Sequence, residues 1–137
     1  MGDRRKSREL ALQALFSLDV NEADSTQGVQ DFCDQHEDDL GEAVKPFFME
    51  LVNGVIEARE EIDRLLDKWA KNWKISRMPV VDRNIMRLAV FELLKRPDIP
   101  ASVSINEAVE IGKKFGTRDS GPFINGVLDR IRSQENL

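Results

Sequence analysis

Residues 104–129 read Ser-Ile-Asn-Glu-Ala-Val-Glu-Ile-Gly-Lys-Lys-Phe-Gly-Thr-Arg-Asp-Ser-Gly-Pro-Phe-Ile-Asn-Gly-Val-Leu-Asp, and they predict two amphipathic helices joined by a short polar bend. Ser104 and Glu107 have the spacing of a capping box, in which two side chains satisfy backbone donors at the start of a helix. Gly116 is suited to the left-handed backbone that often ends a helix. The stretch therefore predicts a helix, a bend near Gly116 and a second helix.

The bend combines cations, a polar helix start and an aromatic side chain. Asp119 or Ser120 can cap the second helix. A helix N-terminus beside cations and an aromatic ring can hold phosphate and stack a base. The same lysines can instead complement the helix dipole, and Phe123 can instead belong to the core. The residues concerned are Lys113, Lys114, Gly116, Arg118, Asp119, Ser120 and Phe123.

The beginning of the chain is strongly basic, although the formal net charge of the whole chain is -5. Apolar residues at helical spacing predict an amphipathic helix over about residues 5–20, with the cations at its leading end. Cations in that position oppose the helix dipole, so they suggest another use, such as binding phosphate. The basic residues are Arg4, Arg5, Lys6 and Arg8.

Helical periodicity continues through the rest of the chain and predicts an all-α fold. Residues 42–73 form either two helices or one bent helix, and Pro79 marks the start of another. Trp69 and Trp73 share an apolar stripe, which favours the core or an edge contact over a ligand platform. We expect two small helical bundles packed into one domain, spanning about residues 1–78 and 79–137.

Two Asn-Gly-Val triplets, at 53–55 and 125–127, lie inside these helical patterns. A glycine within a helix costs roughly 1 kcal/mol relative to alanine, so it needs a packing reason. We therefore expect close contacts between helices at Gly54 and Gly126.

Composition excludes several classes of protein. A single cysteine, Cys33, cannot form an intramolecular disulfide, and a single histidine, His36, cannot build a familiar zinc site. No stretch is long and apolar enough to span a membrane or to form a signal-peptide core. No nucleophile with its base and no glycine-rich phosphate loop is evident. We expect a cytoplasmic protein with no catalytic residues, metal or cofactor.

Seven short motifs follow one another along nearly the whole chain, at residues 4–9, 81–83, 88–93, 105–110, 114–116, 119–120 and 123–129. In this order they resemble the NusB transcription antitermination factors. The resemblance implies an all-helical, non-catalytic protein that binds single-stranded boxA RNA of nascent ribosomal RNA leaders. It also implies a shared task with NusE, a small-subunit ribosomal protein, in the transcription elongation complex. A homodimer without RNA is a further state that it allows.

The resemblance also assigns residues to the two partners. Phe16 and Asp82 would lie toward NusE. The RNA-facing residues would be Arg4, Arg5, Lys6, Arg8, Lys113, Lys114, Gly116, Arg118, Asp119, Ser120 and Phe123. One strand can touch all of these only if the basic start of the chain lies beside the bend.

Two alternative functions stay open. Residues 19–42 hold nine acids and no lysine or arginine, so the chain could be a helical protein-interaction module that meets a basic partner. NusB-like domains also precede the catalytic domain of certain RNA methyltransferases, and the chain could be a stand-alone relative of such a domain.

Overall fold

The computed structural model describes residues 2–22, 24–71 and 73–137, and every regular element in these ranges is helical. This confirms the predicted all-α fold. The elements are α1 (Asp3–Asn21), α2 (Ser25–Gln35), α3 (Lys45–Glu57), α4 (Arg59–Trp69), the short 3-10 helix η1 (Ile75–Arg77), α5 (Val80–Lys95), α6 (Ala101–Phe115) and α7 (Ser120–Gln134).

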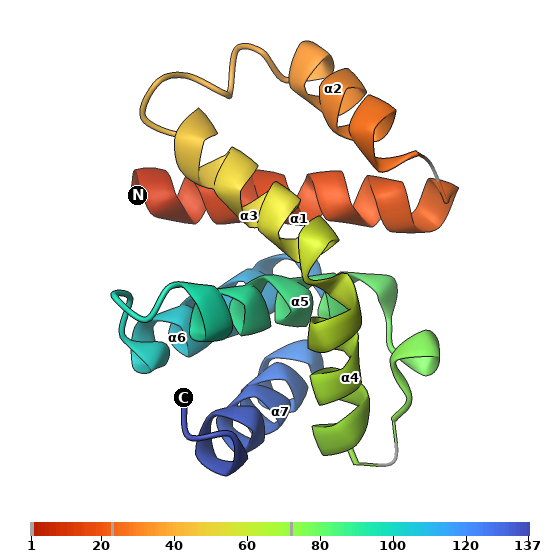
Figure 1. Cartoon of the computed structure of the whole chain (residues 1–137), viewed down its shortest axis with the longest axis vertical. Helices are drawn as coiled ribbons and strands as arrows, with labels where there is room; N and C mark the ends of the chain where they lie inside the picture. Colours follow the sequence, from red (N-terminus) through yellow and green to blue (C-terminus); the bar gives the residue numbers. More distant parts are fainter. Residues whose placement is uncertain (1, 23, 72) are drawn as a thin grey trace.

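The helices gather around α5. In Figure 1, α1, α2 and α3 form the upper part of the molecule, and α4, α5, α6 and α7 form the lower part. Helix α5 contacts α1, α3, α4, α6 and α7. From Asn84 to Leu93 its residues are all buried, polar and charged ones included. A helix enclosed on every side is the centre of its fold rather than a surface helix with one apolar stripe.

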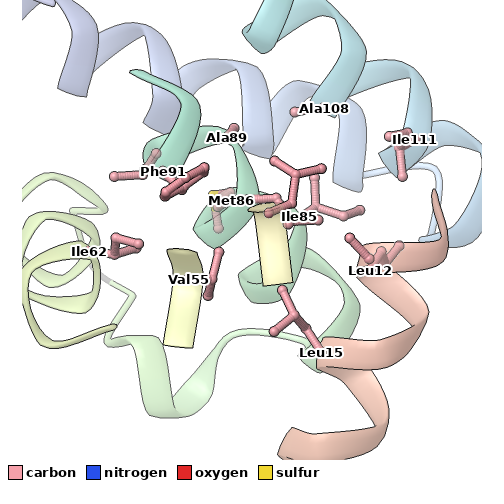
Figure 2. Packing of buried hydrophobic residues seen from close by; sticks show 14 of the residues in the cluster. Leu12, Leu15, Val55, Ile62, Ile85, Met86, Ala89, Phe91, Ala108 and Ile111 are labelled. Carbon is pink, nitrogen blue, oxygen red and sulfur yellow. The ribbon is translucent and has the colours of Figure 1, made fainter. Parts of the chain in front are cut away.

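One hydrophobic core joins the two parts of the molecule (Figure 2). Its labelled members are Leu12 and Leu15 of α1, Val55 of α3, Ile62 of α4, Ile85, Met86, Ala89 and Phe91 of α5, and Ala108 and Ile111 of α6. This core continues from α1 to α7. The division into two bundles near residue 78 stays a prediction.

The helix boundaries settle one open choice. Residues 42–73 form two helices, since α3 ends at Glu57 and α4 begins at Arg59 after a break at Ala58. Helix α5 begins directly after Pro79, as predicted.

The capping box predicted at Ser104 and Glu107 is wrong. Helix α6 already begins at Ala101, preceded by Pro100, so Ser104 lies inside the helix. The Ser104 hydroxyl is buried and donates a hydrogen bond of 2.8 Å to Glu92, while Glu107 accepts from Arg5. Both side chains that the local spacing assigned to a cap therefore form hydrogen bonds with residues of other helices.

Gly116 follows the last residue of α6, as predicted, but its backbone is extended (φ -95°, ψ -155°) rather than left-handed. The reason for a glycine here is space, because a Cβ atom would collide with the side chain of Ser120. The bend then closes through the Thr117 amide, which donates to the Ser120 hydroxyl oxygen over 2.9 Å.

The two Asn-Gly-Val triplets differ in their packing. A Cβ atom on Gly54 would overlap the ring of Phe91, which confirms a close contact between α3 and α5. A Cβ atom on Gly126 would meet nothing within 4 Å, and this glycine is exposed. The close contact predicted at Gly126 is therefore wrong, because this position of α7 faces solvent.

Candidate nucleic-acid interface

Side chains join the basic start of α1 to the middle and the C-terminal end of α6. Arg5 donates from Nε to Glu107 of α6 over 2.6 Å. One turn further along α1, Glu9 accepts from Lys114 Nζ over 2.9 Å. The two regions that one RNA strand would have to touch are therefore neighbours, joined by charge-assisted hydrogen bonds.

Arg8 is buried in this contact, with 4% of its surface exposed. Its guanidinium donates two hydrogen bonds of 2.8 Å to Glu92 of α5 and one of 3.3 Å to Glu107. Arg8 thus ties α1 to α5 and α6 from the inside, and it contributes nothing to the exposed surface. The unfavourable position of Arg5 and Arg8 in the helix dipole is explained by these acidic partners, which local sequence could not identify.

Arg5 remains partly exposed and stays charged. The hydrogen bond to Glu107 raises the pKa of Arg5 further above its usual value, against the opposing effect of burial. The same hydrogen bond lowers the pKa of Glu107. Each charge therefore holds its neighbour in the ionised form.

Arg4 and Lys6 are exposed at the start of α1. The Arg4 guanidinium lies 5.3 Å from the centroid of the Phe47 ring of α3, and Lys6 lies 3.6 Å from Asp39. Phe47 is also approached by Arg8 and by Arg96, at 5.3 Å and 5.5 Å. The sequence offered no indication of this contact, because the three arginines come from different segments of the chain.

At the bend, Lys113, Lys114, Arg118 and Asp119 are exposed. Lys113 forms an ion pair of 3.1 Å with Glu110 of its own helix. Helix α7 begins at Ser120, but the Asp119 side chain makes no capping hydrogen bond. The bend thus has exposed cations of its own, and Lys114 links it to α1 through Glu9.

Ser120 and Asp82 are buried under the bend rather than exposed on it. The Ser120 hydroxyl donates to Asp82 Oδ1 over 2.7 Å, which joins the start of α7 to the start of α5. Only 4% of Asp82 is exposed, and burial raises the pKa of its carboxyl group. The structure gives both residues a positioning role; direct contact of Ser120 with RNA and of Asp82 with NusE stay predictions.

A surface groove of about 340 Å³ opens beside the bend, lined by Trp73, Pro79, Asp82, Thr117, Asp119 and Phe123. Phe123 is partly buried against the core, and its ring meets that of Trp73 edge to face with centroids 6.2 Å apart. Phe123 therefore belongs partly to the core, and its stacking on RNA stays a prediction. Trp73 is 49% exposed and follows the end of α4, so it lies outside the core and makes an edge contact, the other of the two alternatives that its stripe favoured.

A second exposed apolar face lies on α1. Phe16 is 38% exposed and Val20 is 54% exposed. Residues four apart lie on the same side of a helix, so these two side chains form one patch.

The described residues contain no group of three or more His, Cys, Asp or Glu side chains arranged to hold a metal ion. Within the same ranges, every helix is too short or too polar to cross a membrane.

The chain is similar over its whole length to known proteins. The NusB family model matches residues 5–133. Transcription antitermination protein NusB of Desulforapulum autotrophicum is 60% identical over 137 residues, which cover 100% of this chain and 96% of the relative. That name agrees with the expectation of a non-catalytic role.

Solved structures show the same fold. T. maritima NusB is 36% identical, has a TM-score of 0.85, and covers 98% of this chain with 94% of its own. A chain in the crystal structure of antitermination factors NusB and NusE in complex with dsRNA is 24% identical, has a TM-score of 0.86, and covers 96% of this chain with 97% of its own. From its match to the family model and its identity to a full-length relative, the chain belongs to the NusB family.

Proposed function

We propose that the protein is a non-catalytic antitermination factor that binds the boxA element of nascent ribosomal RNA together with NusE, within the transcription elongation complex. The observation that carries this proposal is the contact between Lys114 and Glu9, which sets the basic start of α1 beside the bend. We infer that two cationic regions that are far apart in the sequence act together as one RNA-binding surface, which we call the basic strip. Its exposed cations are Arg4, Lys6, Lys113, Lys114 and Arg118.

The basic strip suits a single strand of RNA. Phosphates are held by exposed cations, while unstacked bases can be held by aromatic rings and read by polar side chains. The strip offers the cations, Phe123 offers an aromatic edge, and Asp119 offers an exposed hydrogen-bond acceptor. The net negative charge of the chain does not oppose this function, because phosphates respond to the local distribution of charge.

Four residues of the predicted RNA-binding set would act differently from the exposed cations. Arg5 donates two hydrogen bonds to the carboxylate of Glu107, and Arg8 is buried against Glu92. Gly116 and Ser120 shape the bend. We infer that these residues hold the basic strip in position, and that their loss would affect RNA through the fold.

NusE would bind at the patch formed by Phe16 and Val20. Exposed apolar side chains on neighbouring turns of a helix favour a protein partner over RNA. The fold match described above is to a chain from a structure that contains NusB, NusE and dsRNA. A protein partner on α1 and an RNA strand on the basic strip could be bound at the same time, because they use different residues of the helix.

The direct test is a binding titration of labelled boxA RNA and of a scrambled RNA, each with and without NusE. We expect tighter binding of boxA RNA, strengthened by NusE. Arg118→Ala should weaken binding, whereas Arg132→Ala, which removes an exposed arginine from the far end of α7, should leave it unchanged. Absence of RNA binding under every condition would contradict the proposal and favour the protein-interaction module.

A further inference from the structure

The groove beside the bend has features that the basic strip does not explain. Its walls come from three separate places: Trp73 from the segment after α4, Pro79 and Asp82 from the start of α5, and Thr117, Asp119 and Phe123 from the bend and α7. It is concave, and its volume of about 340 Å³ is accessible from solvent. A half-exposed indole facing such a space lacks the apolar cover that a tryptophan normally has.

We propose that this groove receives one base of the RNA, stacked on the indole of Trp73, and that it selects a base with an exocyclic amino group. The inference rests on the proposed function, since it names the residue and the class of base that the RNA-binding surface would use. It adds Trp73 as a base-stacking residue, which neither the motifs nor the charge pattern pointed to.

The position of the groove supports this occupant. Thr117 and Asp119 line the groove, and Arg118 lies between them in the sequence as an exposed cation of the basic strip. A phosphate held at Arg118 would therefore lie at the mouth of the groove. Each nucleotide carries its base as a side group on the sugar–phosphate backbone. The base next to this phosphate can therefore turn toward the groove while the backbone follows the cations.

The aromatic lining provides the stacking surface. Phe123 meets Trp73 edge to face, at 67° between the ring planes, and is itself packed against the core. This contact supports the indole from one side and leaves the rest of it exposed. Base stacking on aromatic side chains tolerates every base, so the rings provide affinity without selecting the base.

Selection would come from the carboxylate of Asp119. Asp119 lines the groove and is exposed, and a carboxylate accepts hydrogen bonds but donates none when it is ionised. Adenine, cytosine and guanine each carry an exocyclic amino donor, whereas the single ring donor of uracil, N3–H, lies between two carbonyl oxygens. A base with an amino group can therefore donate to Asp119, while uracil would have to bring a carbonyl oxygen close to the carboxylate in order to donate from N3–H.

The test uses boxA RNA in which single positions are made abasic, together with the full-length protein and its Trp73→Ala and Trp73→Phe variants. Val103→Ala is the matched control, because Val103 is an exposed apolar residue at the opposite end of α6 from the bend. We expect Trp73→Ala to bind RNA about 5- to 150-fold more weakly, the range of one lost stacking contact. Trp73→Phe should retain most of the affinity, and Val103→Ala should retain all of it.

One abasic position should weaken binding to the wild-type protein by a similar factor but have little effect on Trp73→Ala. Replacing that base with uracil should also weaken binding, whereas exchange among amino-bearing bases should be tolerated better. A Trp69→Phe variant leaves Trp73 as the only indole, and its fluorescence should be quenched by the intact RNA and not by the RNA abasic at that position.

Urea unfolding of each variant separates binding from folding. Equal RNA affinity of the wild-type protein and Trp73→Ala, with no quenching of Trp73, would overturn the inference and leave the proposed function intact. Failure of the wild-type protein to bind any RNA would overturn both. If Trp73→Ala does not fold, the fluorescence of Trp73 in the Trp69→Phe variant tests the inference. Quenching by intact RNA but not by the RNA abasic at that position would support it, and equal fluorescence with and without RNA would overturn it.

Discussion

Arg8 and Glu92 form a buried ion pair through two hydrogen bonds of 2.8 Å each, joining the first turns of α1 to the last turns of α5. The hydroxyl of Ser104 in α6 completes the site by donating to Glu92. Three helices therefore meet at one pair of opposite charges. Because a buried charge is tolerated only while its partner is present, this pair fixes how α1 lies relative to α5 and α6.

Arg8→Ala should lower the free energy of unfolding by about 3–5 kcal/mol, because Glu92 would be left buried without its partner. Urea denaturation measures this loss. Arg4→Ala is the matched control: Arg4 is exposed, so the variant should keep nearly all of its stability and lose RNA affinity instead. Wild-type stability of Arg8→Ala would contradict the structural role given to this arginine.

Gly54→Ala should destabilise the protein by about 1–3 kcal/mol, the usual cost of overpacking a core, because the added methyl group would overlap the ring of Phe91. Gly126→Ala makes the same change in the other Asn-Gly-Val triplet, where the space is open. It should stabilise α7 by about 0.5–1 kcal/mol, since alanine is the better helix former. Thermal unfolding of both variants measures the difference, and equal effects would show that the two triplets pack alike.

Acid should destabilise the protein partly through Asp19 of α1. Burial opposes ionisation of this carboxyl group, but hydrogen bonds from Arg83 and Asn84 and the charge of Arg87 prevail and lower its pKa from 3.8 to about 2. Because its pKa is lowered in the folded state, ionised Asp19 stabilises the fold above pH 3.8. This stabilisation is lost as the pH falls toward 2. Its contribution at neutral pH is roughly 2 kcal/mol.

Asp19→Asn should therefore be less stable than the wild-type protein at pH 7, and the difference should shrink as the pH falls below 4. Urea unfolding midpoints across this range measure it. Asp129→Asn, at an exposed position of α7, should show no such dependence. A stability difference that is the same at pH 7 and at pH 2 would exclude the ion pairs of Asp19 as its source.

RNA affinity should depend steeply on salt. If the five exposed cations of the basic strip each neutralise a phosphate, affinity should fall about a hundredfold between 50 and 200 mM salt. Lys113→Ala should reduce the slope of log affinity against log salt concentration by the contribution of about one phosphate contact. Arg132→Ala should not change this slope. Fluorescence anisotropy at several salt concentrations provides the slopes, and an affinity independent of salt would exclude phosphate binding by the strip.

The sequence by itself determined the helical class of the protein, because apolar spacing, prolines and helix-ending glycines act over a few residues. It placed the start of α5 after Pro79 and the end of α6 before Gly116. It also identified the basic start of the chain and the cations of the bend, which are visible as local composition. Gly54 could be recognised for the same reason, as a glycine that its own helix would not favour.

Only the tertiary structure decided which of these side chains are available to a partner. Arg5 forms a hydrogen bond with Glu107, which is 102 residues away in the sequence. Arg8 bonds to Glu92, 84 residues away, and Ser120 bonds to Asp82, 38 residues away. Local spacing carries no information about such partners, since they are set by how helices pack. The same packing left Trp73 half-exposed beside Phe123. Burial and charge pairing between distant segments therefore determine which of the basic and aromatic residues remain on the surface.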